Sequence, residues 1–147
     1  MKFSKMDHIA IMNPQRKLIP RLLSGKKTIE SRWYVHRRSP WNKIKIGDTV
    51  YFKDSGKPVN VSAMVSDVYQ IEIKNKKHLE EIVRTYRTDI SNEPYNEFIK
   101  KVNNKKYCIL IFLKDVKTVR PFSINKKGYG AMSAWISVPD INTIQVK

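Results

Sequence analysis

Hydrophobic and polar positions alternate over several short stretches of the chain, which is the period of half-buried β-strands. This alternation, together with short apolar runs, predicts strands over residues 8–12, 27–35, 49–53, 59–73, 107–119, 134–138 and 142–146. The alternation breaks near Ser66, which predicts a β-bulge in the 59–73 strand. The turn-forming residues at 54–58 favour a hairpin between the strands on either side of them.

Three helices are predicted between these strands. Asn13-Pro14 begins a short helix that ends at Ser24-Gly25, and Pro20 predicts a kink in this helix or a delayed start. Later in the chain, hydrophobic residues recur at helical spacing in two stripes: Leu79, Ile82, Val83 and Tyr86, then Tyr95, Phe98, Ile99 and Val102. The order of elements predicts an α+β fold, a small and mostly antiparallel β-barrel with flanking helices, in a single domain over residues 1–147.

The charge is strongly positive and unevenly distributed. The formal net charge is +16, from 29 Lys and Arg against 13 Asp and Glu. Residues 15–45 contain ten bases and one acid, residues 100–130 contain nine bases and one acid, and residues 46–99 are nearly balanced. If folding brings the two basic segments together, they form a face suited to the phosphate backbone of a nucleic acid. Another polyanion, an anionic membrane surface and simple solubility are the alternatives that the charge leaves open.

Several classes of protein are excluded by what the sequence lacks. Cys108 is the only cysteine, so the chain has no internal disulfide and no cysteine-based zinc cluster, and it suits the reducing cytoplasm. No apolar run reaches membrane-spanning length and the N-terminal residues lack a signal-peptide pattern, so we expect neither membrane insertion nor secretion. There is no phosphate-binding loop, no dinucleotide fingerprint and no His pair at metal-ligand spacing, so no cofactor and no metal are predicted. His8, His36 and His78 are isolated in the sequence.

The segment 25–32 is the strongest candidate for a functional site. A glycine ends the predicted helix, two lysines follow, and the next strand carries polar groups on both faces. Glu30 is the only acid among the ten bases of residues 15–45. One interpretation is that Glu30 forms an ordinary ion pair with Arg32 or a neighbouring lysine. The other is that Glu30 is a partly buried carboxylate in a basic cleft, where it orients a ligand amine or holds the charge of a lysine.

The same segment resembles a known protein family. Gly25-Lys26-Lys27-Thr28-Ile29-Glu30-Ser31-Arg32 is similar to the G-x-K-x-x-E-x-R signature of ASCH domains, which belong to the PUA-like superfamily. Residues 44–52 are similar to the Gly-Asp turn and strand that follow it in the family, and the resemblance extends over about residues 7–120. It implies a PUA-like β-barrel with Lys27, Glu30 and Arg32 in a cleft that binds RNA or a modified nucleotide.

The resemblance also implies an alternative function, because some ASCH proteins are enzymes. One branch removes an acetyl group from acetylated cytidine, and ribonuclease activity is reported for another. Lys27 matches the lysine of the amidohydrolase branch, but Glu30 occupies the position of its nucleophilic threonine and Thr28 lies two residues too early. A carboxylate does not replace a hydroxyl nucleophile in amide hydrolysis. The alternative is therefore a small hydrolase for a modified nucleoside or RNA with Lys27 and Glu30 as an acid–base pair, and the sequence leaves open whether the protein is an enzyme.

A glycine-containing loop near the C-terminus provides a second set of candidate residues. Its two lysines and one tyrosine suit phosphate contacts and base stacking. The full set of predicted nucleic-acid-binding residues is Lys26, Lys27, Glu30, Arg32, Arg37, Arg38, Trp41, Lys126, Lys127, Tyr129 and Trp135, with Arg16 and Lys17 as further phosphate contacts and Trp33 and Tyr34 as further stacking candidates. Trp41, in a polar loop, is expected to be the most exposed of these aromatic residues.

The predicted partner is RNA, and DNA remains an alternative. A third hypothesis assigns the helical segment 76–103 to docking of a protein partner, but both of its hydrophobic stripes are expected to pack against the sheet. The sequence does not identify a protein partner.

Overall fold

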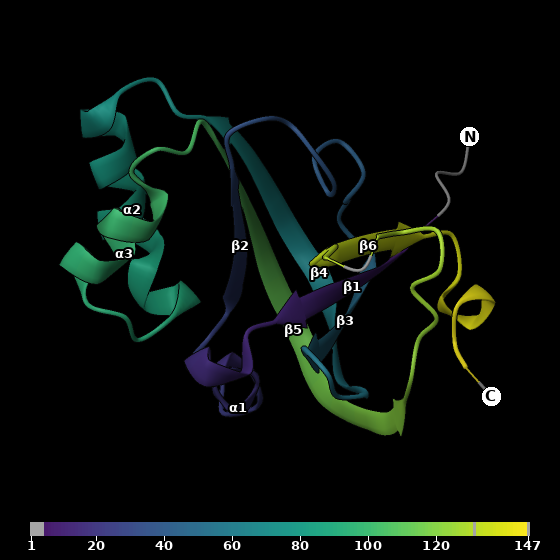
Figure 1. Ribbon diagram of the computed structural model, residues 1–147. Helices are drawn as coiled ribbons and strands as arrows, with labels where there is room; N and C mark the ends of the chain where they lie inside the picture. Colours follow the sequence, from purple (N-terminus) through teal and green to yellow (C-terminus); the bar gives the residue numbers. More distant parts are fainter. Residues whose placement is uncertain (1–4, 131, 147) are drawn as a thin grey trace.

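The computed structural model describes residues 5–130 and 132–146, which fold around one six-stranded sheet (Figure 1). The elements, in chain order, are β1 (Asp7–Met12), the 3₁₀ helix η1 (Pro14–Arg16), α1 (Leu18–Leu23), β2 (Ile29–Tyr34), β3 (Thr49–Asp54), β4 (Val59–Glu72), α2 (Lys76–Ile90), α3 (Tyr95–Val102), β5 (Tyr107–Phe122), β6 (Trp135–Val138) and the 3₁₀ helix η2 (Ile141–Thr143). The sheet is a curled half-barrel, which confirms the predicted α+β class.

The strand order is β2-β5-β4-β3-β1-β6, and every neighbouring pair is antiparallel except β1 and β3. The long strands β4 and β5 pair along most of their length and form the centre of the sheet. Their register shifts between Val65 and Asp67, where the break in alternation at Ser66 predicted a bulge. Such irregularities increase the local bend of a sheet, and here they accompany its curl (Figure 1).

Three clusters of buried side chains hold the layers together. The first packs α1 against β3 and β5 and includes Phe52 and Ile111. The second packs α2 and α3 against β2 and β5, and both predicted helical stripes belong to it. The third lies under the C-terminal segment, next to β1 and β6. Because the helical stripes are used in the second cluster, the hypothesis of a helical docking face has little support. None of the helices in the described ranges is long and apolar enough to cross a membrane.

Two of the predicted elements differ in the structure. Residues 142–146 were predicted as a strand, but η2 lies here, because the Asp140 side chain accepts a hydrogen bond from the Asn142 N–H and caps a tight turn. The predicted short helix is divided in two by Lys17, which has a left-handed backbone conformation. Pro20 does not disrupt α1, since it lies in the first turn, where a backbone N–H has no partner within the helix.

Candidate functional site

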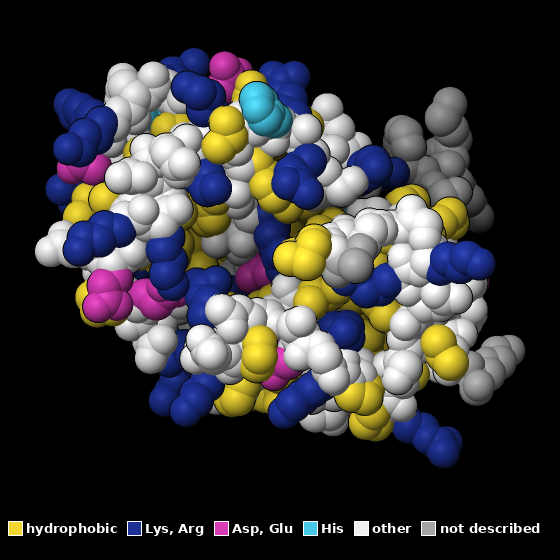
Figure 2. Space-filling view, in the orientation of Figure 1, with side chains coloured by type: hydrophobic (Ala, Val, Ile, Leu, Met, Phe, Trp, Pro, Cys, Tyr) yellow, Lys and Arg dark blue, Asp and Glu magenta, His cyan; other side chains and the backbone are white. Residues whose placement is uncertain are grey.

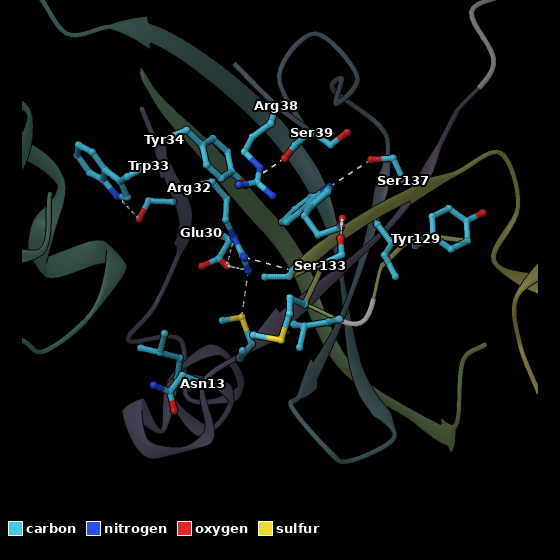
Figure 3. A pocket seen from close by; sticks show the side chains of 18 of the residues that line it. Asn13, Glu30, Arg32, Trp33, Tyr34, Arg38, Ser39, Tyr129, Ser133 and Ser137 are labelled. Carbon is cyan, nitrogen blue, oxygen red and sulfur yellow. Dashed lines mark hydrogen bonds and ion pairs between the residues drawn. The ribbon is translucent and has the colours of Figure 1, made fainter. Parts of the chain in front are cut away.

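A cavity of about 780 Å³ opens between the helical layer and the C-terminal part of the sheet. Its walls come from β2, from the loop at residues 38–43, from α3 and from residues 128–129 and 132–137, with the end of β1 and η1 at one side. Figure 2 shows this region as a hollow with Lys and Arg side chains around it. Figure 3 shows the side chains that point into it.

Glu30 and Arg32, which line this cavity, form a buried ion trio with Lys27 behind them. The Glu30 side chain is 5% exposed, and its Oε1 accepts a hydrogen bond from Lys27 Nζ at 3.0 Å. Its Oε2 accepts from Arg32 Nη2 at 2.7 Å and from Arg32 Nε at 3.1 Å. Lys27 Nζ also donates to the carbonyl oxygens of Ile29 at 2.6 Å and Ile90 at 2.9 Å. All three N–H groups of the Lys27 ammonium therefore have acceptors within the protein.

The electrostatics of the trio keep Glu30 ionised. Burial alone would raise the pKa of Glu30, but the charges and hydrogen bonds of Lys27 and Arg32 lower this pKa from 4.5 to about 2. Burial lowers the pKa of Lys27, while Glu30 acts in the opposite direction. Two cations share one carboxylate, so the trio retains one positive charge, and it is the Arg32 guanidinium that borders the cavity.

The local backbone explains why these residues meet. Gly25 follows α1 with a φ of +79°, a conformation that favours glycine, and reverses the chain direction. The Lys27 N–H then donates to the Arg21 carbonyl, and the Thr28 N–H donates to the Asp89 carbonyl. These bonds hold the start of β2 between α1 and the end of α2, so that the Lys27 side chain enters the protein interior. Alternation along β2 then places Ile29 in the helical core and Glu30 on the cavity wall.

Arg32 connects three parts of the chain that are distant in sequence. Its Nη1 donates to the Ala134 carbonyl at 3.2 Å, and its Nη2 lies 3.6 Å from the Met12 sulfur. Its guanidinium carbon is 5.1 Å from the centre of the Trp135 ring, a cation–π arrangement. Arg32 thus links β2 to the end of β1 and to the start of β6, as Figure 3 shows.

A second ion trio brings the two basic segments of the sequence to the same cavity. Glu93 accepts hydrogen bonds from Arg16 and from Lys101, and both of these cations line the cavity. Burial would raise the pKa of Glu93, but its bonds to Lys101 and Arg16 lower this pKa. Arg16 belongs to the first basic segment and Lys101 to the second. Arg38 and Lys43 also line the cavity, and neither has a carboxylate partner among the described residues.

The remaining predicted site residues divide into two groups. Arg38, Tyr129 and Trp135 line the cavity, as Glu30 and Arg32 do. The predicted residues that do not line it are Lys17, Lys26, Lys27, Arg37, Trp41, Lys126 and Lys127. The Arg37 guanidinium instead lies 5.3 Å from the centres of the Trp41 and Tyr107 rings. The expectation of an exposed Trp41 was wrong, because its ring is half-buried against the main core and packs edge-on to Tyr107 at 5.3 Å.

Sequence reasoning missed a chain of polar side chains that ends on the cavity wall. His8 is fully buried, and its Nε2 lies 2.8 Å from Asp48 Oδ2 while its Nδ1 lies 2.8 Å from Ser137 Oγ. Ser137 lines the cavity and His8 does not. His8 and Ser137 are 129 residues apart and face each other because β1 and β6 are paired in this register. No spacing within the sequence indicates this contact.

Comparison with solved structures identifies the fold. The crystal structure of a Tyr-to-Phe variant of the ASCH protein from Zymomonas mobilis aligns with a TM-score of 0.67 at 14% sequence identity and covers 93% of each chain. This chain has the ASCH fold. A second crystal structure of the Zymomonas mobilis ASCH protein aligns with a TM-score of 0.64 at 15% identity, over 88% of this chain and 85% of that one. The resemblance to the ASCH fold, expected from residues 25–32, is thereby confirmed. No protein-family model and no curated protein matches the sequence.

Replacing the buried Lys27 tests the energetic role of the first ion trio. Lys27→Ala removes one of the two cations that hold the buried Glu30 carboxylate, and it leaves the Ile29 and Ile90 carbonyl groups without their donor, so we expect a loss of about 3–5 kcal/mol in unfolding free energy. The neighbouring Lys26 is exposed, so Lys26→Ala is the matched control and should change stability by less than about 0.5 kcal/mol. Urea denaturation followed by circular dichroism measures both. Equal stabilities of the two variants would show that the trio contributes little.

The lowered pKa of Glu30 predicts a specific dependence of stability on pH. A carboxyl group whose folded-state pKa lies below its usual value stabilises the fold above pH 4.5, and this contribution is lost as the pH falls from 4.5 towards about 2. Glu30→Gln should remove much of the acid dependence, whereas Glu81→Gln, at an exposed position on α2, should retain it. The measurement is the unfolding free energy at pH 5, 4 and 3. An acid dependence in Glu30→Gln as steep as in the unmodified chain would contradict this assignment.

Proposed function

We propose that this chain binds single-stranded RNA, with phosphate groups at the basic rim of the cavity and one nucleotide inside it. The observation that carries the proposal is the charge of the cavity. Among the described residues, five cations line it, namely Arg16, Arg32, Arg38, Lys43 and Lys101, and Glu30 is the only carboxylate that does so. Each nearby carboxylate is shared by two cations, so the cavity stays positive although it contains ion pairs.

The availability of these cations supports phosphate binding. Arg38 is exposed and its guanidinium carbon lies 5.3 Å from the centre of the Tyr34 ring, which orients the group without neutralising it. Lys43 is exposed on the same loop. Arg32 has three of its nitrogen atoms engaged by the protein, so it is held rigid with its charge toward the cavity. Exposed cations and a firmly held Arg32 together suit a polyanion whose phosphates pass along the rim.

The shape and the aromatic residues of the cavity favour a single strand over a duplex. A volume of about 780 Å³ is in the range of small-molecule sites, so an unpaired nucleotide fits, whereas bases stacked in a helix cannot enter. Trp33, Tyr34, Tyr129 and Trp135 line it. Tyr129 is 40% exposed and is the ring most available for stacking, because Arg38 and Arg32 lie against Tyr34 and Trp135. RNA is favoured over DNA by the ASCH fold, and the experiment below compares the two.

Lys27 and Glu30 fit a supporting role in this function better than acid–base catalysis. Lys27 is 1% exposed, does not line the cavity and donates to three acceptors in the protein. A pKa of about 2 makes Glu30 a weak base at neutral pH. The hydrolase with this pair as its acid and base therefore receives no support from the geometry. The pair instead fixes Arg32 in the position where it faces the cavity.

A salt titration with matched variants tests the proposal. The affinity for a fluorescent single-stranded RNA, measured by anisotropy, should fall as the salt concentration rises. The slope of log affinity against log salt concentration should become less steep by about 0.7 for each phosphate contact that is lost. Arg38→Ala should weaken binding about tenfold and reduce the slope by about that amount. The control is Lys77→Ala, because Lys77 is exposed on α2 and does not line the cavity. DNA of the same sequence should bind more weakly. An affinity that salt does not change, or equal losses for both variants, would contradict the proposal.

A further inference from the structure

A chain of buried polar groups leads from Asp48 to the cavity wall, and each of its hydrogen bonds has a defined direction. Asp48 Oδ1 accepts from the Met6 N–H at 3.1 Å, and Oδ2 accepts from the Lys45 N–H at 3.0 Å. A carboxylate held by two backbone N–H groups accepts hydrogen bonds and has no proton of its own to give. Its third contact, with His8 Nε2 at 2.8 Å, therefore requires a proton on Nε2.

The other ring nitrogen of His8 is an acceptor. Trp135 Nε1 lies 3.2 Å from His8 Nδ1, and an indole nitrogen only donates, so Nδ1 carries no proton. Burial lowers the pKa of His8 from 6.5, although the hydrogen bond and charge of Asp48 and the charge of Asp7 raise it. Lys45, the other charged group that acts on the ring, lowers it. The imidazole is therefore neutral at pH 7, with a lone pair on Nδ1.

The hydroxyl proton of Ser137 is directed at this lone pair. Ser137 Oγ lies 2.8 Å from His8 Nδ1, which is a hydrogen-bond distance, and only the hydroxyl has a proton to place between the two atoms. Trp135 Nε1 is also 3.2 Å from Ser137 Oγ and donates toward it. This contact uses one of the two acceptor positions of the oxygen. Ser137 Oγ thus keeps one acceptor position and has no proton left to donate to a ligand.

The fold places this oxygen at the border between the protein interior and the cavity. His8 and Asp48 are 0% and 1% exposed, whereas Ser137 is half-buried and lines the cavity. His8 on β1 is directly opposite Ser137 on β6. Figure 3 shows Ser137 on the side of the cavity across from Glu30. Because the groups that hold the hydroxyl are shielded from water, a ligand in the cavity meets Ser137 as a fixed hydrogen-bond acceptor.

Other acceptors on the cavity wall already receive hydrogen bonds from within the protein. Both oxygens of Glu30 accept from Lys27 or Arg32. Three backbone carbonyl groups also accept from side chains, namely those of Ser39, Ser133 and Ala134. The cations around the cavity only donate, and they suit phosphate or carbonyl oxygens. Ser137 therefore adds the opposite polarity to the cavity, a site for an N–H group of the ligand.

We propose that Ser137 selects nucleobases that carry an exocyclic amino group, namely adenine, cytosine and guanine, and disfavours uracil. This inference rests on the proposed function, because it concerns the base that the cavity takes from RNA. An amino N–H donates to Ser137 Oγ, whereas a carbonyl oxygen at the same place meets a lone pair. The single ring N–H of the uracil base lies between two carbonyl oxygens, so it approaches an acceptor poorly. A site built around a hydrogen bond rejects a ligand that lacks the partner.

RNAs with deamino nucleosides test the proposal, because these nucleosides lack the amino group and keep the rest of the base. The probe is a short fluorescent single-stranded RNA in which one position holds the test nucleoside and every other position lacks a base. Adenosine is compared with purine riboside, cytidine with pyrimidin-2-one riboside, and both with uridine, by anisotropy at pH 7. In at least one of the two pairs, the amino nucleoside should bind about tenfold more tightly than its deamino counterpart, and uridine should bind no better than the deamino RNAs.

Two serine variants assign the discrimination to its residue. Ser137→Ala should bind the amino and deamino RNAs equally, with the affinity that the unmodified chain has for the deamino RNA. The buried His8 keeps Trp135 Nε1 as a donor in this variant, so the fold should be retained, which circular dichroism checks. The matched control is Ser133→Ala: Ser133 also lines the cavity, but its hydroxyl donates to the Trp135 carbonyl. This control should keep the tenfold difference.

The possible outcomes separate this proposal from the proposed function. Binding of the amino and deamino RNAs with equal affinity by the unmodified chain overturns the selection by Ser137 and leaves RNA binding intact. A difference that persists in Ser137→Ala, or that disappears in Ser133→Ala as well, also overturns it. If none of these RNAs binds at low salt, the proposed function fails and the selection of a base fails with it.

Discussion

A carboxylate that is removed from water loses its hydration, and the protein must replace it with hydrogen bonds and opposite charges. The groups that do this for Glu30 connect several distant parts of the chain. Lys27 and Arg32 approach Glu30 from opposite ends of the carboxylate, at distances of 2.7–3.1 Å. Because each of these cations also bonds to the backbone of a distant segment, the trio ties β2 to the end of α2 through Ile90 and to the start of β6 through Ala134. Loss of Glu30 leaves two cations without their carboxylate, and loss of either cation removes hydrogen bonds from the buried carboxylate, which is costly.

The same constraint explains the electrostatics of the cavity. A trio of two cations and one anion retains a positive charge, and the geometry turns Arg32 rather than Lys27 toward the ligand space. Glu93 repeats the pattern with Arg16 and Lys101, two cations that also line the cavity. Acidic residues therefore hold Arg16, Arg32 and Lys101 in place without cancelling the positive charge of the cavity. Rigid positive charge costs little reorganisation when an anion binds.

Local sequence patterns predicted much of the fold and of the candidate site. The remaining features depend on contacts between segments that are distant in the sequence. Residues 25–32 indicated both the ASCH fold and a special role for Glu30, because an isolated acid in a basic strand is chemically conspicuous. Of the two interpretations of Glu30, the structure shows features of both: an ion pair, and a buried carboxylate that holds the charge of a lysine. The bulge near Ser66 and the two helical stripes were also local signals.

The features that escaped prediction depend on contacts between distant segments. Trp41 lies in a polar loop, but Tyr107 and the main core cover its ring. A strand was expected at residues 142–146, but the structure has the 3₁₀ helix η2 there, because the Asp140 side chain caps it. The pairing of His8 with Ser137 depends on the register between the first and last strands of the chain. Hydrophobic alternation specifies that such strands exist but does not specify which residues face each other.

The most direct measurement is a crystal structure of the chain in complex with a short single-stranded RNA. The account predicts one nucleotide inside the cavity, with phosphate oxygens within hydrogen-bond distance of Arg38 and of the guanidinium of Arg32, while the Lys27–Glu30 contact stays unchanged. RNA bound on another face of the molecule, with the cavity empty of it, would contradict the account.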